Sequence, residues 1–366
     1  MSSDLKPKVF VAMSGGVDSS LAAALLQERG FDVHGAFIMT WQIPGLPCSA
    51  AEDRRDAMRV AAKLNIPFHT FDFAEEYKRG VVDYMLREYA AGRTPNPDVM
   101  CNKEIKFGAF LRKTREMGAE YMATGHYARL ERIKNHESRI MNRLLMSKDT
   151  NKDQTYFLWM LGQEALSRTL FPIGDYLKSE VREMARERGL ITADKRDSQG
   201  LCFLGKIDVR AFLARHLGAK EGSVLDAASG KAIGVHAGAA LYTLGQRHGF
   251  RVEHETPRSE PLYVVSRDIA ANTITVASRA AVLRVPSARC EVDLGICNWI
   301  GEAPEAGGVY LARIRHRGEL MPCRIEPFER DMSRTRVLFE TPLLAASGQS
   351  LVLYEGERVV GGGVIG

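Results

Sequence analysis

The sequence predicts an α/β protein, with a doubly wound parallel sheet followed by a β-rich C-terminal region. Apolar strands alternate with helices from Val9 to about Thr124, and a Ser-Gly-Gly turn separates the first strand from the first helix. From about Val224, short β-prone runs are divided by turn residues. Alternation of strands and helices implies right-handed crossovers between parallel strands. Many short strands are typical of β-sandwiches and β-barrels.

Length and composition indicate a globular protein of two or three domains. The chain has 366 residues, of which 45% are hydrophobic, so it can bury a large core. No apolar run approaches the roughly 20 residues that span a bilayer, and residues 1–6 lack the apolar core of a signal peptide. We therefore expect a cytoplasmic protein with no membrane partner. A net charge of +5 permits a nucleic-acid partner without requiring one.

The cysteines are scattered along the chain. None lies in a Cys-x-x-Cys pair or beside a histidine at metal-ligand spacing, so we expect no metal site of this kind and no permanent disulfide in a reducing compartment. Each thiol is then either a small buried hydrophobe or a reactive group. The six are Cys48, Cys101, Cys202, Cys290, Cys297 and Cys323.

The first half of the chain repeats one pattern of strand and helix. The first helix runs to about Arg29 and ends at Gly30, a usual residue after a helix. Strands are expected at residues 33–39 and 67–73, and helices at residues 51–64 and 74–91. Parallel sheets of this kind bind ligands at the carboxyl ends of their strands.

The loop after the first strand, Ser14-Gly15-Gly16-Val17-Asp18-Ser19, is a candidate anion site. Two adjacent glycines let the backbone turn its N–H groups inward, and Asp18 or Ser19 can cap the next helix. Such a corner binds phosphate above all. It is neither a Walker A loop nor a dinucleotide fingerprint, because the required lysine and third glycine are missing. A purely structural turn is the alternative.

Residues 92–103 interrupt the alternation with two prolines. Pro95 and Pro97 fix the backbone and should delay the next helix until Val99 or later. Asp98 and Cys101 would then share one face of its first turn. A thiol beside a helix start, with Lys103 and Lys106 nearby, has reason for a lowered pKa; a buried, inert thiol is the competing interpretation.

The following segments supply further polar loops. The strand at residues 121–124 ends in Gly125 and His126, where glycine allows a ligand to approach closely and the histidine could contact a nucleotide or RNA. A charged hairpin is expected at residues 128–145, and an apolar helix at residues 157–161. Cys202 follows the basic residues Lys195 and Arg196, so it is either core or a reactive thiol.

Taken together, these motifs resemble the bacterial tRNA-specific 2-thiouridylases, a family within the PP-loop ATP pyrophosphatases. The matches run in order through nearly the whole chain. They are Ser14-Gly-Gly-Val-Asp-Ser19, Arg93-Thr-Pro-Asn-Pro-Asp98, Cys101-Asn-Lys-Glu-Ile-Lys-Phe107, Ala123-Thr-Gly-His-Tyr127, Asn151-Lys-Asp-Gln154, Asp197-Ser-Gln-Gly-Leu-Cys-Phe203 and Thr243-Leu-Gly-Gln-Arg247.

The resemblance implies three domains and a set of site residues. We expect a PP-loop catalytic domain at residues 1–205, a small central domain at 206–275 and a C-terminal tRNA-binding β-barrel at 276–366. The implied nucleophile is Cys101 and the implied persulfide carrier is Cys202, with Asp98 beside them. The implied ATP contacts are Ala12, Met13, Ser14, Gly15, Gly16, Val17, Asp18, Ser19, Ile38 and Gly125. The implied tRNA contacts are Asn96, Pro97, Asp98, His126, Lys152, Asp153, Gln154, Arg315, His316 and Gln349.

The family makes 2-thiouridine at the wobble position of tRNAs for Lys, Glu and Gln, which implies the chemistry expected here. AMP transferred from ATP, with Mg²⁺ on its phosphates, would turn the C2 oxygen of uridine into a leaving group. A persulfide on Cys202, supplied by a sulfur-carrier or cysteine desulfurase protein, would attack the carbon. Cys101 would then release the sulfur by forming a disulfide, or help to regenerate the site after persulfide breakdown. Asp98 could be a general acid or base or could orient the base, which must leave its stack.

Two other functions fit parts of the sequence. Another adenylating PP-loop enzyme would explain the phosphate loop but not the two cysteine motifs. An ATP-gated RNA-binding protein would explain the positive charge and the β-rich region. For RNA binding, the alternation Arg313-Ile314-Arg315-His316-Arg317 predicts a strand with all three arginines on one face, facing phosphates.

Overall fold

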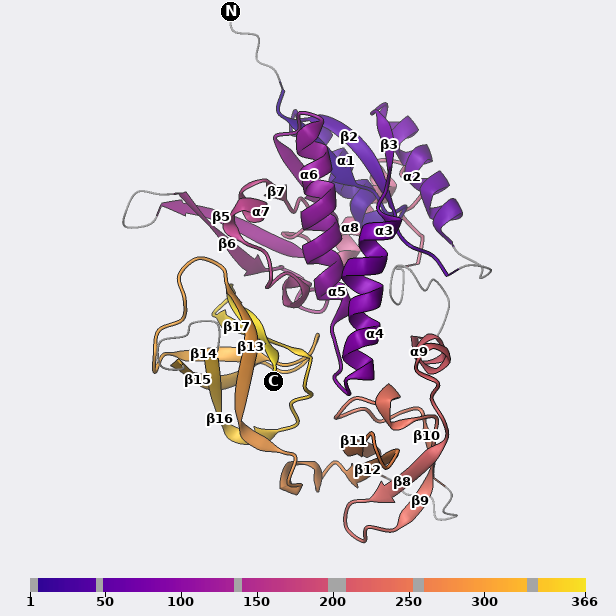
Figure 1. Ribbon diagram of the computed structural model, residues 1–366. Helices are drawn as coiled ribbons and strands as arrows, with labels where there is room; N and C mark the ends of the chain where they lie inside the picture. The colour runs from indigo at the N-terminus through magenta and orange to yellow at the C-terminus, as the bar shows by residue number, and fades with distance from the viewer. Residues whose placement is uncertain (1–5, 44–48, 135–139, 197–208, 253–259, 328–334) are drawn as a thin grey trace, which may run out of the picture.

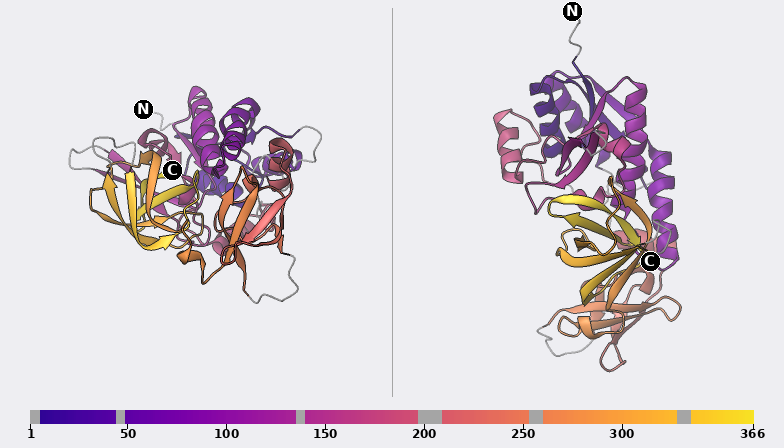
Figure 2. Two further views of the ribbon diagram at one scale, coloured as in Figure 1. Left: turned by 60° about the horizontal axis from the view of Figure 1, so that its bottom comes forward. Right: turned by 90° about the vertical axis from the view of Figure 1, so that its left-hand side faces the viewer.

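The protein has three parts, an N-terminal α/β domain, a central β domain and a C-terminal β-barrel (Figure 1). The structure, a computed structural model, describes residues 6–43, 49–134, 140–196, 209–252, 260–327 and 335–366. The barrel and the central domain lie next to each other on the same side of the N-terminal domain (Figure 2).

The N-terminal domain is built on a parallel sheet with the strand order β3-β2-β1-β4-β7. Its strands are β1 (Lys8–Ala12), β2 (Asp32–Met39), β3 (Phe68–Asp72), β4 (Tyr121–Thr124) and β7 (Thr169–Leu170). Its helices are α1 (Val17–Glu28), α2 (Ala50–Leu64), α3 (Ala74–Tyr77), α4 (Asp83–Ala90), α5 (Pro97–Met100), α6 (Leu111–Glu116), α7 (Gln163–Ser167) and α8 (Lys178–Glu187). The predicted doubly wound fold is confirmed.

Helices cover both faces of this sheet, so its central strand β1 is buried and apolar from Val9 to Val11. Val9 and Val11 of β1 pack with α1, α2 and α8, whereas Phe10 packs with the helices from α3 to α6. Strands buried on both faces read as continuous apolar runs. π-helical segments, Lys78–Val82 and Cys101–Phe110, join α3 to α4 and α5 to α6 into two long rods.

The central domain is a small sheet with the strand order β10-β9-β8-β12-β11. Its elements are α9 (Val209–Leu217), β8 (Gly222–Asp226), β9 (Ala232–His236), β10 (Phe250–Val252), β11 (Leu262–Asp268) and β12 (Thr273–Ser278). A short 3₁₀ helix, Ala239–Leu241, precedes the turn at Thr243–Arg247. Buried Val224, Ile274 and Val276 form its core.

Six strands close the C-terminal barrel, because β13 pairs with both β16 and β18. They are β13 (Arg289–Trp299), β14 (Val309–Arg313), β15 (Met321–Pro327), β16 (Thr335–Leu343), β17 (Ser350–Glu355) and β18 (Arg358–Ile365). The terminal glycine run belongs to β18, where a Cβ on Gly361 would lie 2.2 Å from the carbonyl oxygen of Asn298. Glycine therefore permits the close approach of β13 and β18.

The hairpin of β5 (Ala128–Lys134) and β6 (Ile140–Met146) joins the N-terminal domain to this barrel. β6 pairs with β18 through Leu144 and Val359. The hairpin lies between residues 128 and 146, as the sequence predicted, but its pairing with the end of the chain has no local signal. The barrel sheet is thus extended by a piece of the first domain.

Three local predictions were wrong, each for a physical reason. The helix expected from Val99 begins at Pro97, because proline is tolerated in the first helical position and Asn96 caps the helix by accepting from the Val99 N–H at 3.3 Å. The strand carrying the arginine alternation ends at Arg313. Residues 314–320 instead form the loop of the β14–β15 hairpin, with Arg317 at a φ of +58°.

The third error is the helix expected at residues 157–161, where the structure has a 3₁₀ turn, Thr155–Phe157, and then a loop. Contacts with the barrel explain the difference. The Tyr156 hydroxyl donates to the Ser350 carbonyl at 2.8 Å, and the Trp159 indole donates to the Ser350 hydroxyl at 3.0 Å. Tertiary contacts thus outweigh the local helical preference of this segment.

An ion pair between Asp153 and Arg313 fastens the same junction. The two side chains are 3.3 Å apart and 0% and 9% exposed. Ser147 and Thr155 also donate to the carboxylate, at 3.1 and 3.0 Å. Burial raises the pKa of Asp153, and its hydrogen bonds and Arg313 oppose the rise. Arg313 was expected to face RNA phosphates; the structure buries it instead, so that expectation is wrong.

No helix within the described ranges combines the length and apolarity that crossing a membrane requires.

We expect Arg313→Met to destabilise the protein strongly, because it leaves the Asp153 carboxylate buried without its cation. Loss of one partner of a buried pair costs about 3–5 kcal/mol. The double variant Asp153→Asn, Arg313→Met removes both charges and should lose less. Urea unfolding measures both free energies, and a single variant as stable as the double would contradict this account.

Candidate active site

The phosphate loop, defined as Ser14–Ser19, turns sharply between β1 and α1. Gly15 has a φ of +75°, and a Cβ there would lie 2.2 Å from the Asp53 carbonyl oxygen. Only glycine at this position therefore lets α2 pack against the loop. Gly16 starts α1 in an extended conformation, and among the described residues a Cβ there would meet only the Ser14 hydroxyl, at 3.5 Å. Its outer side is therefore open to a ligand.

The hydroxyls of the loop hold its own backbone. Ser19 Oγ accepts from the Ser14 N–H at 3.2 Å and donates to the Gly16 carbonyl at 3.2 Å, and Ser20 donates to the same carbonyl at 2.8 Å. The other predicted ATP residues adjoin the loop. Ala12 ends β1, Met13 and Val17 are buried in the core, and Ile38 is partly buried near the carboxyl end of β2.

Gly125 brings the end of β4 against the start of α1. Thr124 pairs with Ala12, so the two strands end side by side at the point where the strand order reverses. A Cβ on Gly125 would lie 2.6 Å from the Ser19 nitrogen, closer than any side chain allows. In parallel sheets ligands bind at this switch point. The structure therefore places Gly125 beside the phosphate loop, and its contact with ATP stays a prediction.

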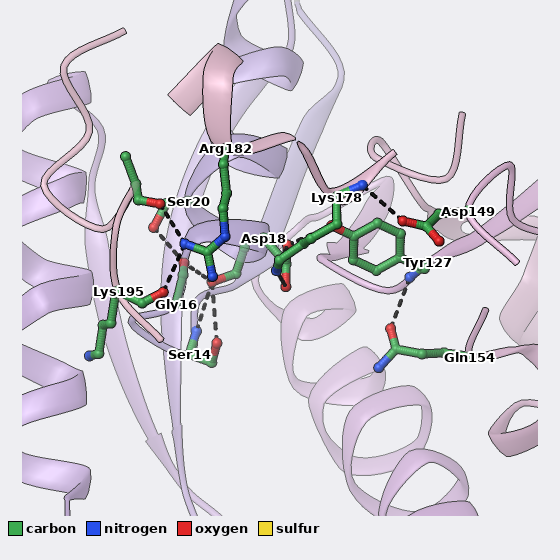
Figure 3. A network of polar contacts seen from close by, with 12 residues as sticks. Ser14, Gly16, Asp18, Ser20, Tyr127, Asp149, Gln154, Lys178, Arg182 and Lys195 are labelled. Atoms are coloured by element: carbon green, nitrogen blue, oxygen red, sulfur yellow. Dashed lines mark hydrogen bonds and ion pairs between the residues drawn. The ribbon is translucent and has the colours of Figure 1, made fainter. Parts of the chain in front are cut away.

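Asp18 lies in an ion pair that the sequence did not reveal. Lys178, the first residue of α8, donates to both Asp18 oxygens at 2.7 and 2.8 Å, and the Tyr127 hydroxyl donates to one of them at 2.9 Å. Figure 3 shows Lys178 and Arg182 pointing from α8 toward the phosphate loop. No local signal marks Lys178, because 160 positions separate it from Asp18.

Arg182 and Lys195 anchor the chain that leads to the second predicted cysteine. Arg182 donates to the carbonyls of Ala193 and Lys195 at 2.7 and 3.0 Å. Lys195 donates to Asp53 at 2.8 Å and to Asp56 at 2.6 Å. Burial disfavours the Lys195 charge, but these hydrogen bonds outweigh it and raise the pKa of Lys195. Cys202 itself, with residues 197–208, lies outside the described residues, as does Cys48.

Asp98 and Cys101 lie at the start of the rod formed by α5, the π-helical segment and α6. Asp98 lies in its first turn, whereas Cys101 is its fifth residue, where the π-helix begins, and is buried at 6% exposure. The two were predicted to share the first turn; because the helix starts at Pro97 rather than near Val99, Cys101 lies just beyond it. π-helical turns are frequent at functional sites. Burial raises the pKa of the Asp98 carboxyl, and the positive charge of Lys106 opposes the rise. The environment thus favours a protonated Asp98 more than water does.

His126 connects this rod with the end of β4. Its Nε2 lies 3.5 Å from Lys106 Nζ, and its Nδ1 lies 2.7 Å from the Thr124 hydroxyl. Burial, and then Lys106, hold the pKa of His126 well below its usual range, so the ring is neutral at pH 7. His126 is 7% exposed, between Phe107 and Phe171. Lys106 therefore lies beside His126 at the end of β4 and also acts on the charge of Asp98.

The other predicted RNA contacts divide into two groups. In the first, Lys152 is partly exposed, Asp153 is the buried partner of Arg313, and Gln154 accepts from the Tyr127 N–H at 2.9 Å. Asp153 and Gln154 thus support neighbouring structure. Of these three, Asp153 is buried, whereas Lys152 and Gln154 are both partly exposed.

The second group lies where the barrel meets both other domains. Arg315 is exposed and comes within 3.4 Å of the position that a Cβ on Gly245 would take. The His316 ring packs on Phe157 at 4.5 Å, and burial, followed by Arg317 and Arg313, lowers the pKa of His316 to about 4. Gln349 donates to the carbonyls of Thr94 and Pro95 at 2.9 and 3.2 Å, directly before Asn96 and Pro97.

Metal-ligand clusters are not part of this geometry. Across the described ranges, no three His, Cys, Asp or Glu side chains come together as a metal site would require.

Comparison with known proteins places this arrangement in a family. Residues 7–206 match the family described as tRNA methyl transferase HUP domain, residues 210–278 the tRNA methyl transferase PRC-barrel domain, and residues 291–365 the aminomethyltransferase beta-barrel domain. A protein of Stenotrophomonas maltophilia named tRNA-specific 2-thiouridylase MnmA is 46% identical, with 98% of this chain and 93% of that one covered. The chain belongs to the tRNA-specific 2-thiouridylase family. It is therefore a tRNA-modifying sulfurtransferase.

A second full-length relative supports the same assignment. A protein of the same name from Pediococcus pentosaceus is 42% identical, with 100% of this chain and 96% of that one covered. Among solved structures, the U34-tRNA thiolase NcsA from Methanococcus maripaludis is more distant, at 16% identity and a TM-score of 0.36 over 58% of this chain and 65% of that one. The assignment rests on the full-length relatives.

The two glycines of the phosphate loop should respond differently to alanine. Gly16→Ala adds a methyl group on the open side, so we expect an unchanged melting temperature and a Kd for ATP raised about tenfold, or about 1.4 kcal/mol. Gly15→Ala forces a side chain into the Asp53 backbone at a positive φ, so it should lower the melting temperature by several degrees. Calorimetry and thermal unfolding measure both effects. Equal melting temperatures for the two variants would contradict the assignment.

Proposed function

We propose that the protein transfers sulfur from a Cys202 persulfide to C2 of the wobble uridine of tRNA, through an adenylated base. One observation carries this proposal. The contact of Gly125 with the start of α1 puts the phosphate loop and the end of β4 together, and Lys106 links the end of β4 to Asp98 on the rod that carries Cys101. These contacts support one shared site for ATP and the base, in a family whose relatives are named 2-thiouridylases.

ATP is the activating substrate in this proposal. The phosphate loop offers the open side of Gly16 and the N-terminus of α1, which suits phosphate groups. Lys178 holds the Asp18 side chain of that loop in place. Mg²⁺ would accompany the triphosphate, as is usual for nucleotide sites, and no step assigned to this chain depends on it.

The bonds change in three steps. The uridine O2 attacks the α-phosphorus of ATP, and pyrophosphate leaves. The terminal sulfur of the Cys202 persulfide attacks C2, and AMP leaves with the former O2. The Cys101 thiolate then attacks Cys202 Sγ, which leaves the new sulfur on C2 and forms a Cys101–Cys202 disulfide that a thiol reductant must reopen. This last step needs the two Cα atoms within about 7 Å.

Asp98 and its neighbours would control protons at the base. A carboxyl whose pKa is raised by burial can donate a hydrogen bond to, or exchange a proton with, the pyrimidine edge. Neutral His126 adds no positive charge there. Asn96 and Pro97 would line the base position because they immediately precede Asp98.

The remaining assignments concern partners and domains. We propose that residues up to about 205 carry the chemistry, that residues 206–275 connect the parts, and that the barrel from about residue 276 holds the tRNA body. The tRNAs for Lys, Glu and Gln would be the substrates, a sulfur-carrier or cysteine desulfurase protein would load Cys202, and the reaction would take place in the cytoplasm. Exposed Arg315, with Gln349 and His316 nearby, marks the proposed RNA side of the barrel.

The persulfide assignment is tested by loading purified variants with sulfur and following them by mass spectrometry with tRNA and ATP. Cys202→Ser should carry no persulfide and make no 2-thiouridine. Cys101→Ser should load sulfur on Cys202 but fail to complete transfer. Cys290→Ser is the control and should behave as wild type. Normal thiolation by Cys202→Ser, or a persulfide on another cysteine, would refute the mechanism.

Binding of tRNA should depend strongly on salt through the β14–β15 loop. Arg315→Ala, Arg317→Ala removes two exposed cations, so the negative slope of log K against log salt should become shallower by about 1.5, at about 0.7–0.9 per lost phosphate contact. Arg112→Ala, Lys113→Ala removes two exposed cations from α6, away from the barrel, and should leave the slope unchanged. Equal slopes for both double variants would count against the proposed RNA side.

A further inference from the structure

The loop of residues 92–96, which we call the bridging loop, is held by both accessory domains at once. It connects α4 to α5 and so delivers Asn96, Pro97 and Asp98 to the site. Figure 1 shows α4 and α5 reaching from the N-terminal domain toward the barrel and the central domain. Its contacts therefore connect the domains and also support the active site.

The barrel holds the middle of the bridging loop. The Thr94 N–H donates to the Ser347 carbonyl at 2.8 Å, and Gln349 donates to the carbonyls of Thr94 and Pro95. The packing is too close for a side chain at Gly348, since a Cβ there would lie 2.9 Å from the Thr94 nitrogen. Thr94 is 3% exposed.

The central domain holds the beginning of the loop through Arg267 of β11. One guanidinium nitrogen donates to the Gly92 carbonyl at 2.6 Å, and the other terminal nitrogen donates to the carbonyl of Tyr242 in its own domain. The guanidinium of Arg267 is partly desolvated, and this burial lowers its pKa. A charged donor also suits this position because Gly92 directly follows the C-terminal end of α4.

The bridging loop is stiff enough to transmit the position of the Gly92 carbonyl to Asp98. Pro95 and Pro97 each fix a φ angle, and the cap of Asn96 on Val99 locks the start of α5. A shift of the Gly92 carbonyl therefore moves Asp98 rather than being absorbed by the chain between them. Small displacements of reacting groups cost large factors in rate.

We infer that Arg267 is a positioning residue for the reaction, which sets the place of Asp98 and Cys101 from the central domain through the Gly92 carbonyl. This inference rests on the proposed function, in which Asp98 and Cys101 act on the base. It gives the central domain a part in catalysis although its own strands carry no reacting group. Arg267 needs no contact with tRNA or ATP for this role.

The test compares steady-state thiolation of tRNA by the full-length variants Arg267→Met, Arg267→Lys and Arg251→Met. Arg267→Met should lower kcat about tenfold at saturating ATP and tRNA while KM for tRNA stays within about twofold, as for an interaction needed only in the transition state. Arg267→Lys keeps a cation that can donate to the Gly92 carbonyl and should recover most of the loss. Arg251→Met changes an exposed arginine of the same domain and should leave kcat unchanged.

Thermal unfolding and ATP affinity, measured on the same samples, separate positioning from folding. An unchanged kcat in Arg267→Met overturns the inference. So does a combined loss of melting temperature, ATP affinity and kcat that lysine fails to rescue, because that result makes Arg267 merely structural. A wild-type protein that makes no 2-thiouridine would instead refute the proposed function, whatever the variants do.

Discussion

The contact between Gly125 and the first turn of α1 is the constraint on which the site depends. A single methyl group at position 125 would overlap the Ser19 nitrogen, so β4 and the phosphate loop meet only because residue 125 lacks a side chain. The next residue, His126, lies 3.5 Å from Lys106, which belongs to the rod that carries Asp98 and Cys101. Without glycine at position 125, the end of β4 and the phosphate loop could not approach each other this closely.

The other domains complete the site from a distance. The buried pair of Asp153 and Arg313 and the contacts of Tyr156 and Trp159 with Ser350 fix the barrel to the first domain. The bridging loop then connects that barrel and the central domain with the start of α5. If tRNA binds across the barrel as proposed, its binding would reach Asp98 through these contacts without any long movement of the proposed reacting groups. A three-domain chain is consistent with such a task, because a tRNA is much larger than the loop that is proposed to activate it.

Local features were predicted from the sequence, and contacts between distant segments were not. The doubly wound sheet, the glycine loop and the hairpin follow from periodicity and from the backbone needs of glycine, which act over a few residues. Lys178 with Asp18 and Arg267 with Gly92 are 160 and 175 positions apart, so no local pattern marks them. The errors at residues 97, 157–161 and 314 arise where a cap, a barrel contact or a hairpin turn outweighed local propensity. The two cysteine motifs were recognised by family resemblance, and Cys202 lies outside the described residues.

The most direct test of one shared site for ATP and base is to follow the oxygen that uridine loses. A tRNA with ¹⁸O at C2 of its wobble uridine is incubated with the sulfur-loaded protein and ATP, and the released AMP is weighed by mass spectrometry. If the phosphate loop activates the base, AMP should carry one ¹⁸O for each 2-thiouridine formed. Unlabelled AMP formed together with 2-thiouridine would show that ATP activates something other than the base, and would contradict the account.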